Sequence, residues 1–166
     1  MESFDRSALV RCSRGSLFGA DAPRLPAQPL LAFDRVAAIS LEGGAFGQGF
    51  ARASRRVQPL DEILAAHFVG DPVVPGSLLI EGLLQLTGFC GAFAGLTGRG
   101  RAASVEGLSF LSEITLADRE IDYEIEVRKI SAGRQTVIAE GLVRSGRREC
   151  LRAERVWVVM VPPSIR

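Results

Sequence analysis

One segment of this chain, residues 77–96, is apolar on almost every side when it is wound as an α-helix. Its apolar residues are not confined to one stripe, which indicates a helix that is buried on most sides. Such a helix needs other elements of the protein to cover it. The apolar positions that carry this prediction are Leu78, Leu79, Leu83, Leu84, Leu86 and Phe89.

Strand-like segments lie on both sides of this helix. The clearest is I-D-Y-E-I-E-V, which alternates apolar and polar residues, and R-V-W-V-V-M-V near the end reads as a buried run. We therefore predict an α+β fold in which an antiparallel β-sheet wraps around one long central helix. The predicted strands lie within residues 30–41, 45–57, 102–110, 120–130, 135–144 and 149–159, and short helices are predicted at 7–14 and 60–66.

Length, charge and composition restrict the classes of function. A chain of 166 residues without a linker fits a single domain spanning residues 1–166. The net charge is +1 and no basic cluster is interleaved with aromatic residues, so nucleic-acid binding is not expected. The N-terminus has early acids and no long apolar run, which argues against a secretory signal. Residues 73–96 could span a membrane by length, but Glu81 would be costly there, so a cytoplasmic location without membrane association is expected.

The cysteines and glycines point to no cofactor. Cys12, Cys90 and Cys150 are far apart, and with one histidine in the chain a zinc site lacks ligands. We interpret Cys90 as a small core residue of the apolar helix. The glycines form neither a dinucleotide-binding fingerprint nor a phosphate-binding loop, so no metal or other cofactor is expected.

The segment H-F-V-G-D-P-V-V-P-G leads from His67, the only histidine, into the apolar helix. A lone histidine is more often structural than catalytic. Here, however, glycines and prolines are costly in regular elements and together specify a shaped loop. Imidazole also changes its charge near neutral pH. We therefore interpret His67 as a candidate general base.

Four residues at the start of the helix complete the candidate site. Glu81 is flanked by apolar residues, and burial of its carboxyl group would favour the protonated form, which can donate a proton. Gln85 lies one turn further and shares a face with Glu81. The N–H groups of Gly76 and Ser77 open the helix and could bind a developing negative charge. The plainer alternatives are that Glu81 is a surface residue and that Ser77 is the N-cap.

Three segments of this chain resemble the β-hydroxyacyl-acyl-carrier-protein dehydratases, and the β-hydroxydecanoyl thioester dehydratase/isomerase branch in particular. The resemblance covers roughly residues 14–160, and its H-F-x-G-D-P-x-x-P-G core is highly specific. The three segments are L-F-G with P-R-L-P at 17–26 and F-D-R-V at 33–36, E-G-G-A-F-G-Q-G at 42–49, and H-F-V-G-D-P-V-V-P-G-S-L-L-I-E-G-L-L-Q-L-T-G-F at 67–89.

The resemblance implies a hot-dog fold that dimerises into a continuous sheet with two sites at the interface. By position, His67 matches the catalytic histidine and Glu81 the catalytic acid, and these two groups come from different subunits in each site. Gly76 matches the oxyanion donor and Gln85 the residue that supports the acid. The branch usually has aspartate where this chain has Glu81, which instead resembles the dehydratase-only branch.

The resemblance also implies a substrate and a partner: dehydration of 3-hydroxyacyl thioesters carried by acyl carrier protein, in fatty acid or in polyketide and polyene biosynthesis. Double-bond isomerisation is left open by the glutamate. Carrier proteins are acidic, and the candidates for docking them are Arg128, Lys129, Arg134 and Arg155. The alternatives are a hot-dog thioesterase, which would not need the His67 loop, and a non-catalytic partner subunit that binds acyl thioesters.

Overall fold

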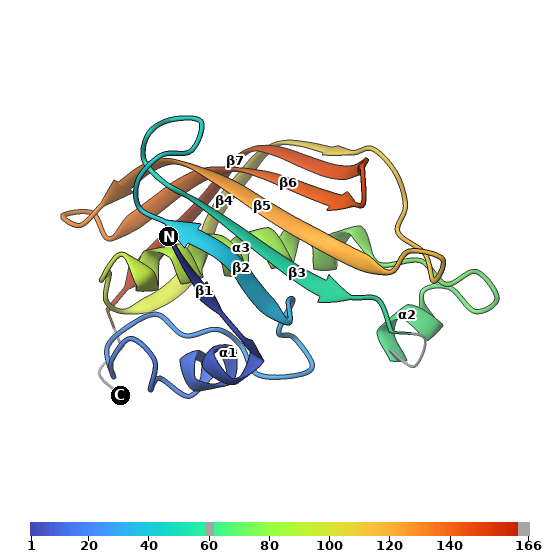
Figure 1. Ribbon diagram of the computed structural model, residues 1–166, viewed down its shortest axis with the longest axis horizontal. Coiled ribbons are helices and arrows are strands. Elements are labelled where there is room, and N and C mark those ends of the chain that lie inside the picture. Colours follow the sequence, from blue (N-terminus) through green and yellow to red (C-terminus); the bar gives the residue numbers. More distant parts are fainter. Residues whose placement is uncertain (59–61, 163–166) are drawn as a thin grey trace.

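The computed structural model describes residues 1–58 and 62–162, and it consists of a curved sheet that covers a long helix (Figure 1). The helices are α1 (Arg6–Ser13), α2 (Glu62–Ala66) and α3 (Gly76–Phe93). The strands are β1 (Glu2–Phe4), β2 (Arg35–Ser40), β3 (Phe50–Arg56), β4 (Arg99–Phe110), β5 (Glu120–Ser131), β6 (Thr136–Ser145) and β7 (Arg148–Val161).

Within the described residues the predicted helices and strands are present, with one strand missed and one helix end corrected. The first two residues of the short helix predicted at 60–66 lie outside the described residues. Strand β1 was not predicted, because three residues are too short to show an alternating pattern. The long helix was predicted to reach residue 96, whereas α3 ends at Phe93. Gly95 follows with a φ of +80°, which a glycine adopts without steric cost, and β4 begins at Arg99. Residues 99–101, which precede the strand predicted at 102–110, therefore already belong to the sheet.

All neighbouring strands of the sheet are antiparallel, in the order β1-β2-β3-β5-β6-β7-β4. This topology confirms the predicted α+β architecture. β4 follows α3 directly in sequence but pairs with β7, the last strand, so β4 forms an edge of the sheet. The outer edge of β4 pairs with no other strand in the described part of the chain.

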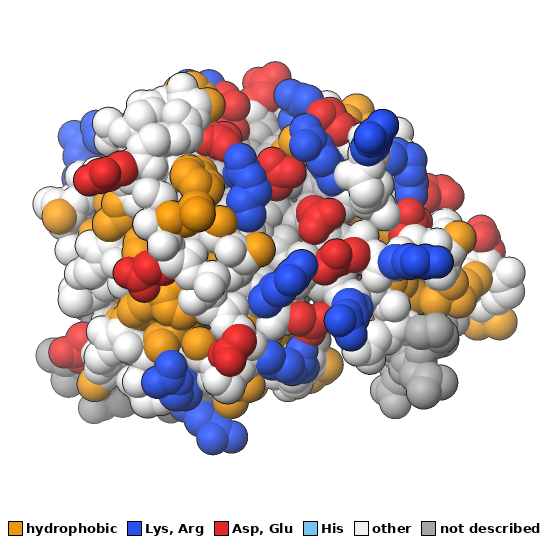
Figure 2. Space-filling model, in the orientation of Figure 1, with side chains coloured by type: hydrophobic (Ala, Val, Ile, Leu, Met, Phe, Trp, Pro, Cys, Tyr) orange, Lys and Arg blue, Asp and Glu red, His pale blue; other side chains and the backbone are white. Residues whose placement is uncertain are grey.

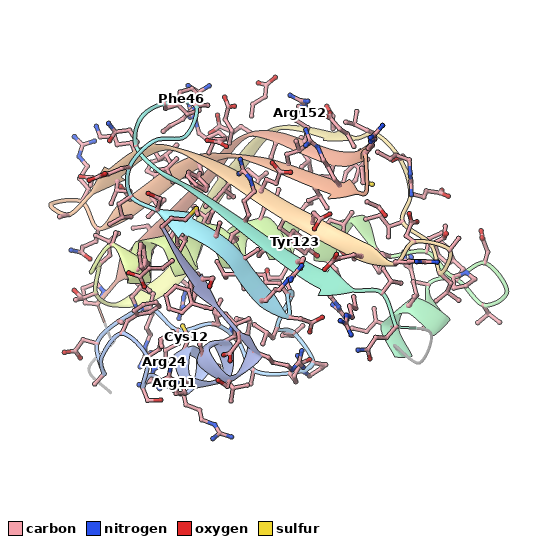
Figure 3. The ribbon with its side chains drawn as sticks, viewed as in Figure 1. Arg11, Cys12, Arg24, Phe46, Tyr123 and Arg152 are labelled. Atoms are coloured by element: carbon pink, nitrogen blue, oxygen red, sulfur yellow. The ribbon has the colours of Figure 1, made fainter. Side chains whose placement is uncertain are left out.

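The core lies between α3 and the concave face of the sheet. In β5 the alternation seen in the sequence turns Ile121, Tyr123, Ile125 and Val127 toward the helix, where all four are buried. Gly82 of α3 allows the helix to approach closely, because a Cβ atom there would lie 2.1 Å from the Tyr123 ring. The figure with side chains shows Tyr123 in the middle of the sheet (Figure 3).

Two sequence interpretations of α3 can be assessed directly. Cys90 is a fully buried core residue, as predicted, and burial raises the pKa of its thiol to about 12. By length and composition alone, Gly76–Phe93 could cross a membrane. However, 56% of the helix is buried inside the molecule, as in the core helix of a globular fold.

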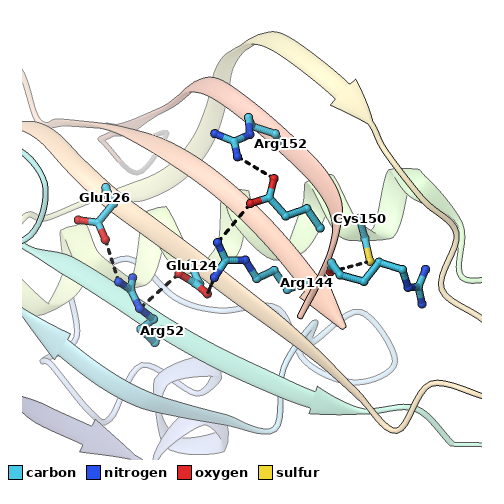
Figure 4. A network of polar contacts seen from close by, with 8 residues as sticks. Arg52, Glu124, Glu126, Arg144, Cys150 and Arg152 are labelled. Atoms are coloured by element: carbon cyan, nitrogen blue, oxygen red, sulfur yellow. Dashed lines mark hydrogen bonds and ion pairs between the residues drawn. The ribbon is translucent and has the colours of Figure 1, made fainter. Parts of the chain in front are cut away.

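The convex face of the sheet carries interspersed positive and negative side chains (Figure 2). Arg52 of β3 contacts Glu124 and Glu126 of β5 at 3.5 and 2.8 Å, and Arg144 of β6 contacts Glu124 and Glu149 at 3.3 Å each (Figure 4). Partly exposed ion pairs of this kind contribute about 0–1 kcal/mol each. This convex face is therefore polar and solvated. The candidate site residues lie instead on α3 and near the ends of the strands.

Candidate active site

The loop that carries His67 is held in shape by its own backbone. The Val73 N–H donates to the His67 carbonyl at 2.7 Å, and Phe68 and Asp71 exchange backbone hydrogen bonds at 2.8 and 3.0 Å. Gly70, inside this turn, has a φ of +83°, which explains the glycine. The peptide bond between His67 and Phe68 is cis, and the two rings stack with centroids 4.2 Å apart.

The hydrogen bond of the His67 ring fixes its tautomer. Nδ1 lies 3.1 Å from the Val73 carbonyl oxygen. Because a carbonyl oxygen can only accept, Nδ1 must carry the proton, and in the neutral ring Nε2 is then the free basic nitrogen. The loop thus presents the half-buried imidazole as a base.

The loop is attached to the segment between β4 and β5. Val74 N–H donates to the Ile114 carbonyl at 2.8 Å, and Val73 forms an isolated bridge with Thr115. Thr115 N–H in turn donates to the Asp118 carboxylate at 2.8 Å. Asp118 therefore stabilises the backbone that positions His67 indirectly, through Thr115.

Asp118 accepts from three groups, and its removal should weaken the fold. Ser145 Oγ donates to it at 2.7 Å and Arg148 contacts it at 2.5 Å, in addition to Thr115. Partial burial by itself would raise the pKa of Asp118, but these hydrogen bonds and the Arg148 charge outweigh that effect and lower it. We expect Asp118→Asn to reduce the free energy of unfolding by about 1–3 kcal/mol at neutral pH.

The lowered pKa of Asp118 determines how its contribution to stability changes with pH. A lowered pKa in the folded state means that the contribution of Asp118 is present above the unfolded-state pKa and is lost as pH falls through the folded-state pKa. Urea unfolding of the wild type and Asp118→Asn should therefore differ most near neutral pH and converge in acid. An equal difference at both pH values would contradict the role of the carboxylate.

The start of α3 lies beside this loop. Gly76 is the first helical residue and Pro75 is the N-cap, without a side-chain cap, so the alternative that Ser77 is the N-cap is wrong. Within the described residues the N–H groups of Gly76 and Ser77 donate to no backbone or side-chain acceptor. Both are available for an oxyanion. A Cβ atom on Gly76 would lie 2.3 Å from the Phe110 ring, so the end of β4 packs on the helix start.

Glu81 and Gln85 form the expected contact on one face of α3. Gln85 Nε2 donates to Glu81 Oε1 at 2.9 Å and to the Leu30 carbonyl at 2.8 Å, while Gln85 Oε1 accepts from Ala32 N–H at 2.9 Å. These bonds anchor the buried Gln85 amide, which then orients the carboxyl group. Leu30 and Ala32 could not be predicted as partners of Gln85, because these contacts join segments more than fifty positions apart.

Glu81 lines a pocket of about 150 Å³. Leu84 also lies in the wall of this pocket. His67 is not among the lining residues. The other lining residues are Pro23, Arg24, Leu25, Pro26, Gln85, Gly88, Phe89, Gly100, Arg101, Ala102 and Val158.

Within one chain, therefore, the structure joins His67 to the start of α3 and joins Glu81 to Gln85, but it does not place His67 in the Glu81 pocket. Sequence reasoning missed Arg24 and Arg101 in the wall of that pocket. Arg24 lies in the P-R-L-P segment, which contributed to the family resemblance but from which no site residue was predicted.

The carrier-docking candidates are distributed over β5, β7 and the β5–β6 turn. Arg128 forms an ion pair with Glu140 and lies over the Phe46 ring, and Arg155 contacts Glu106 at 2.9 Å. Lys129 and Arg134 are exposed and have no carboxylate partner within the described residues. Phe46 marks the tip of the β2–β3 connection near this group (Figure 3). The role of all four in docking stays a prediction.

Comparison with known families agrees with this arrangement of helix, loop and sheet. A model of the FabA-like domain matches residues 25–154, which include the His67 loop, α3 and most of the sheet. The chain belongs to the FabA-like domain family. Its curved antiparallel sheet around α3 is accordingly the hot-dog fold.

Solved structures share the fold of this FabA-like chain at low sequence identity. The dehydratase heterocomplex ApeI:P from Xenorhabdus doucetiae matches with a TM-score of 0.65 and 14% identity, covering 83% of this chain and 87% of that one. AziG from S. sahachiroi matches with a TM-score of 0.56 and 14% identity, covering 77% of this chain and 90% of that one. Cj0977, a sigma28-regulated virulence protein from Campylobacter jejuni, matches with a TM-score of 0.52 and 9% identity, covering 84% of this chain and 92% of that one.

Proposed function

We propose that this FabA-like protein dehydrates 3-hydroxyacyl thioesters to trans-2-enoyl thioesters, with acyl carrier protein as the carrier. The observation that carries the proposal is the position of β4. Its first residues, Gly100 to Ala102, line the Glu81 pocket, and its last residue, Phe110, packs on Gly76 beside the His67 loop. One edge strand thus connects the two halves of a site that are separate within one chain.

Pairing of two copies through β4 would complete the site. Strands that meet across a two-fold axis are antiparallel, so the start of one β4 lies beside the end of the other. That arrangement brings the His67 loop of one subunit toward the Glu81 pocket of its partner. The long unpaired edge of β4 supports such pairing. So do large apolar side chains that are exposed around the loop and the end of β4, namely Phe68, Val69, Phe110 and Leu111.

The chemistry follows from the groups in this combined site. His67 Nε2 removes the C2 proton, while the thioester carbonyl oxygen accepts from the Gly76 N–H. Glu81, in its protonated form, donates a proton to the C3 hydroxyl group. The C2–H and C3–O bonds break, the C2–C3 double bond forms, and water leaves. Gln85 holds the carboxyl group in place throughout.

The finer assignment concerns the branch and the pathway. Glu81 has a longer arm than the aspartate of the dehydratase/isomerase branch, which favours dehydration without double-bond isomerisation. The resembled branch also tends to have a tryptophan just before the helix glutamine, where this chain has Leu84, and the smaller leucine leaves more space beside the acid. Together with the fold shared with a structure described as a dehydratase, these features support a dehydratase of specialised metabolism as much as one of fatty acid synthesis. The cytoplasmic location expected from the sequence stays part of the proposal.

A single assay tests the proposed reaction against its rivals. The protein is incubated with a 3-hydroxyacyl thioester of acyl carrier protein, and the products are followed by mass spectrometry. Loss of one water molecule supports dehydration. Release of free carrier thiol would instead show a thioesterase. Neither product, with the substrate bound, would indicate a non-catalytic subunit that needs a partner, as in a heterocomplex.

Carrier docking gives a separate prediction. Because Lys129 and Arg134 have no carboxylate partner within the described residues, their reversal to glutamate removes positive charge without leaving a buried acid unpaired. We expect Lys129→Glu/Arg134→Glu to lower kcat/KM for carrier-bound substrate about ten-fold or more at low salt. Activity on the N-acetylcysteamine thioester should not change.

The matched control for docking is Arg147→Glu, which reverses an exposed arginine in the β6–β7 turn and should leave both substrates unaffected. Added salt should narrow the gap between wild type and the double variant. Equal losses on carrier-bound and small thioesters would place Lys129 and Arg134 outside the docking surface.

A further inference from the structure

Three arginines that have no carboxylate partner among the described residues lie around a depression next to the Glu81 pocket. We propose that Arg24, Arg99 and Arg101 bind an oxyanion carried by the thioester substrate, which is a phosphate on the pantetheine arm or a carboxylate on the acyl chain. This inference rests on the proposed function, since it assigns a charged group to the substrate of the same site.

The depression and the Glu81 pocket adjoin each other. The depression has a volume of about 480 Å³, and it shares Arg24, Gly100 and Arg101 with the pocket of about 150 Å³ that Glu81 lines. A ligand that reaches Glu81 can therefore extend past the same two arginines. The other residues that line the depression are Ala20, Asp21, Ala22, Gly98 and Arg99.

The charges of the depression favour an anion. Asp21 is the one acid in its lining, against three arginines. Within the described residues Arg24, Arg99 and Arg101 form no ion pair, and the side-chain hydrogen bonds of Arg24 and Arg101 go to the carbonyl oxygens of Ala20 and Gly100. By contrast, the arginines at 6, 35, 52, 128, 144, 148, 152 and 155 all contact carboxylates. Unpaired guanidinium groups gathered in one hollow are suited to bidentate binding of a phosphate or a carboxylate.

The fold brings the three side chains together from distant parts of the sequence. Arg99 and Arg101 are alternate residues at the start of β4, and the Gly98 N–H just before them donates to the Asp21 carbonyl at 2.7 Å. This bond ties β4 to the N-terminal segment that carries Arg24. Figure 3 shows Arg24 beside α1. Gly15 makes room for it, because a Cβ atom there would lie 2.5 Å from Arg24 Nε.

The test measures binding and catalysis separately. Three non-hydroxylated probes, octanoyl-pantetheine, octanoyl-4′-phosphopantetheine and the pantetheine monothioester of octanedioic acid, are titrated by calorimetry. We expect at least one charged probe to bind about ten-fold more tightly than octanoyl-pantetheine, the range of one charge-assisted pair. A preference for the phosphate assigns the pantetheine arm, and a preference for the carboxylate assigns the acyl chain.

The variants Arg99→Gln/Arg101→Gln and, separately, Arg24→Gln should abolish this preference, while Arg147→Gln keeps it. Circular dichroism confirms that each variant is folded. Equal affinity of the wild type for all three probes would overturn the inference, and so would a preference that survives in both variants. Because the probes lack a C3 hydroxyl group, this result does not depend on dehydration. The matching 3-hydroxyacyl substrates test the reaction itself.

Discussion

Replacement of His67 by alanine is expected to reduce dehydration by about 10²–10⁴-fold, the usual contribution of a general base. Among the described residues the ring makes one hydrogen bond, from Nδ1 to the Val73 carbonyl, while the loop is held mainly by backbone bonds. The variant should therefore stay folded. Its kcat on a 3-hydroxyacyl thioester and its urea unfolding curve are the two measurements.

His67→Asn separates a chemical role from a positioning role. The asparagine amide can still donate to the Val73 carbonyl but has no basic nitrogen at the Nε2 position. If His67 is the general base, we expect the asparagine variant to be as inactive as the alanine variant. Substantial recovery by asparagine would show that His67 acts by holding the loop. A folded alanine variant with near wild-type turnover would remove His67 from the mechanism.

Mixed dimers give the second large effect. If each site takes His67 from one subunit and Glu81 from the other, then His67→Ala and Glu81→Gln homodimers are both inactive. A mixed dimer regains one site with both groups. Random mixing in equal amounts makes about half of the dimers mixed, with one intact site of two, so about a quarter of wild-type activity should return.

Glu81→Gln suits this experiment because the new amide oxygen can still accept from Gln85. The two variants are unfolded and refolded together, and the mixed species is separated by a tag on one of them. The control is each variant refolded alone. No recovery in a purified mixed dimer would contradict the shared site, and a fully active monomer in sedimentation would contradict the dimer itself.

The local patterns were reliable where short-range physics decides the structure. Alternation in β5 predicted which residues face the core, and the all-round apolar segment predicted a buried α3. The i, i+4 spacing of Glu81 and Gln85 predicted their contact. Cys90 is likewise the core residue that its helical position indicated. Each of these properties depends on neighbours within about one or two turns of chain.

What depends on distant pairing was not accessible in the same way. β4 looks like the other strands in sequence, yet it pairs with β7 and lies at an edge. The hydrogen bonds of Gln85 with Leu30 and Ala32 also join distant segments. So does the position of Arg24 in the depression at the start of β4. Such contacts depend on the free energy of the whole fold rather than on local propensity.

The sequence by itself therefore determined the kinds of element except β1, the burial of α3 and of one face of β5, and the chemical groups His67 and Glu81. Only the tertiary structure decided that these two groups lie apart in one chain, and that β4 runs from one to the other along a free edge. The physical reason is that hydrophobic periodicity is written in neighbouring residues. The order of strands in a sheet, by contrast, is selected by contacts that close long loops.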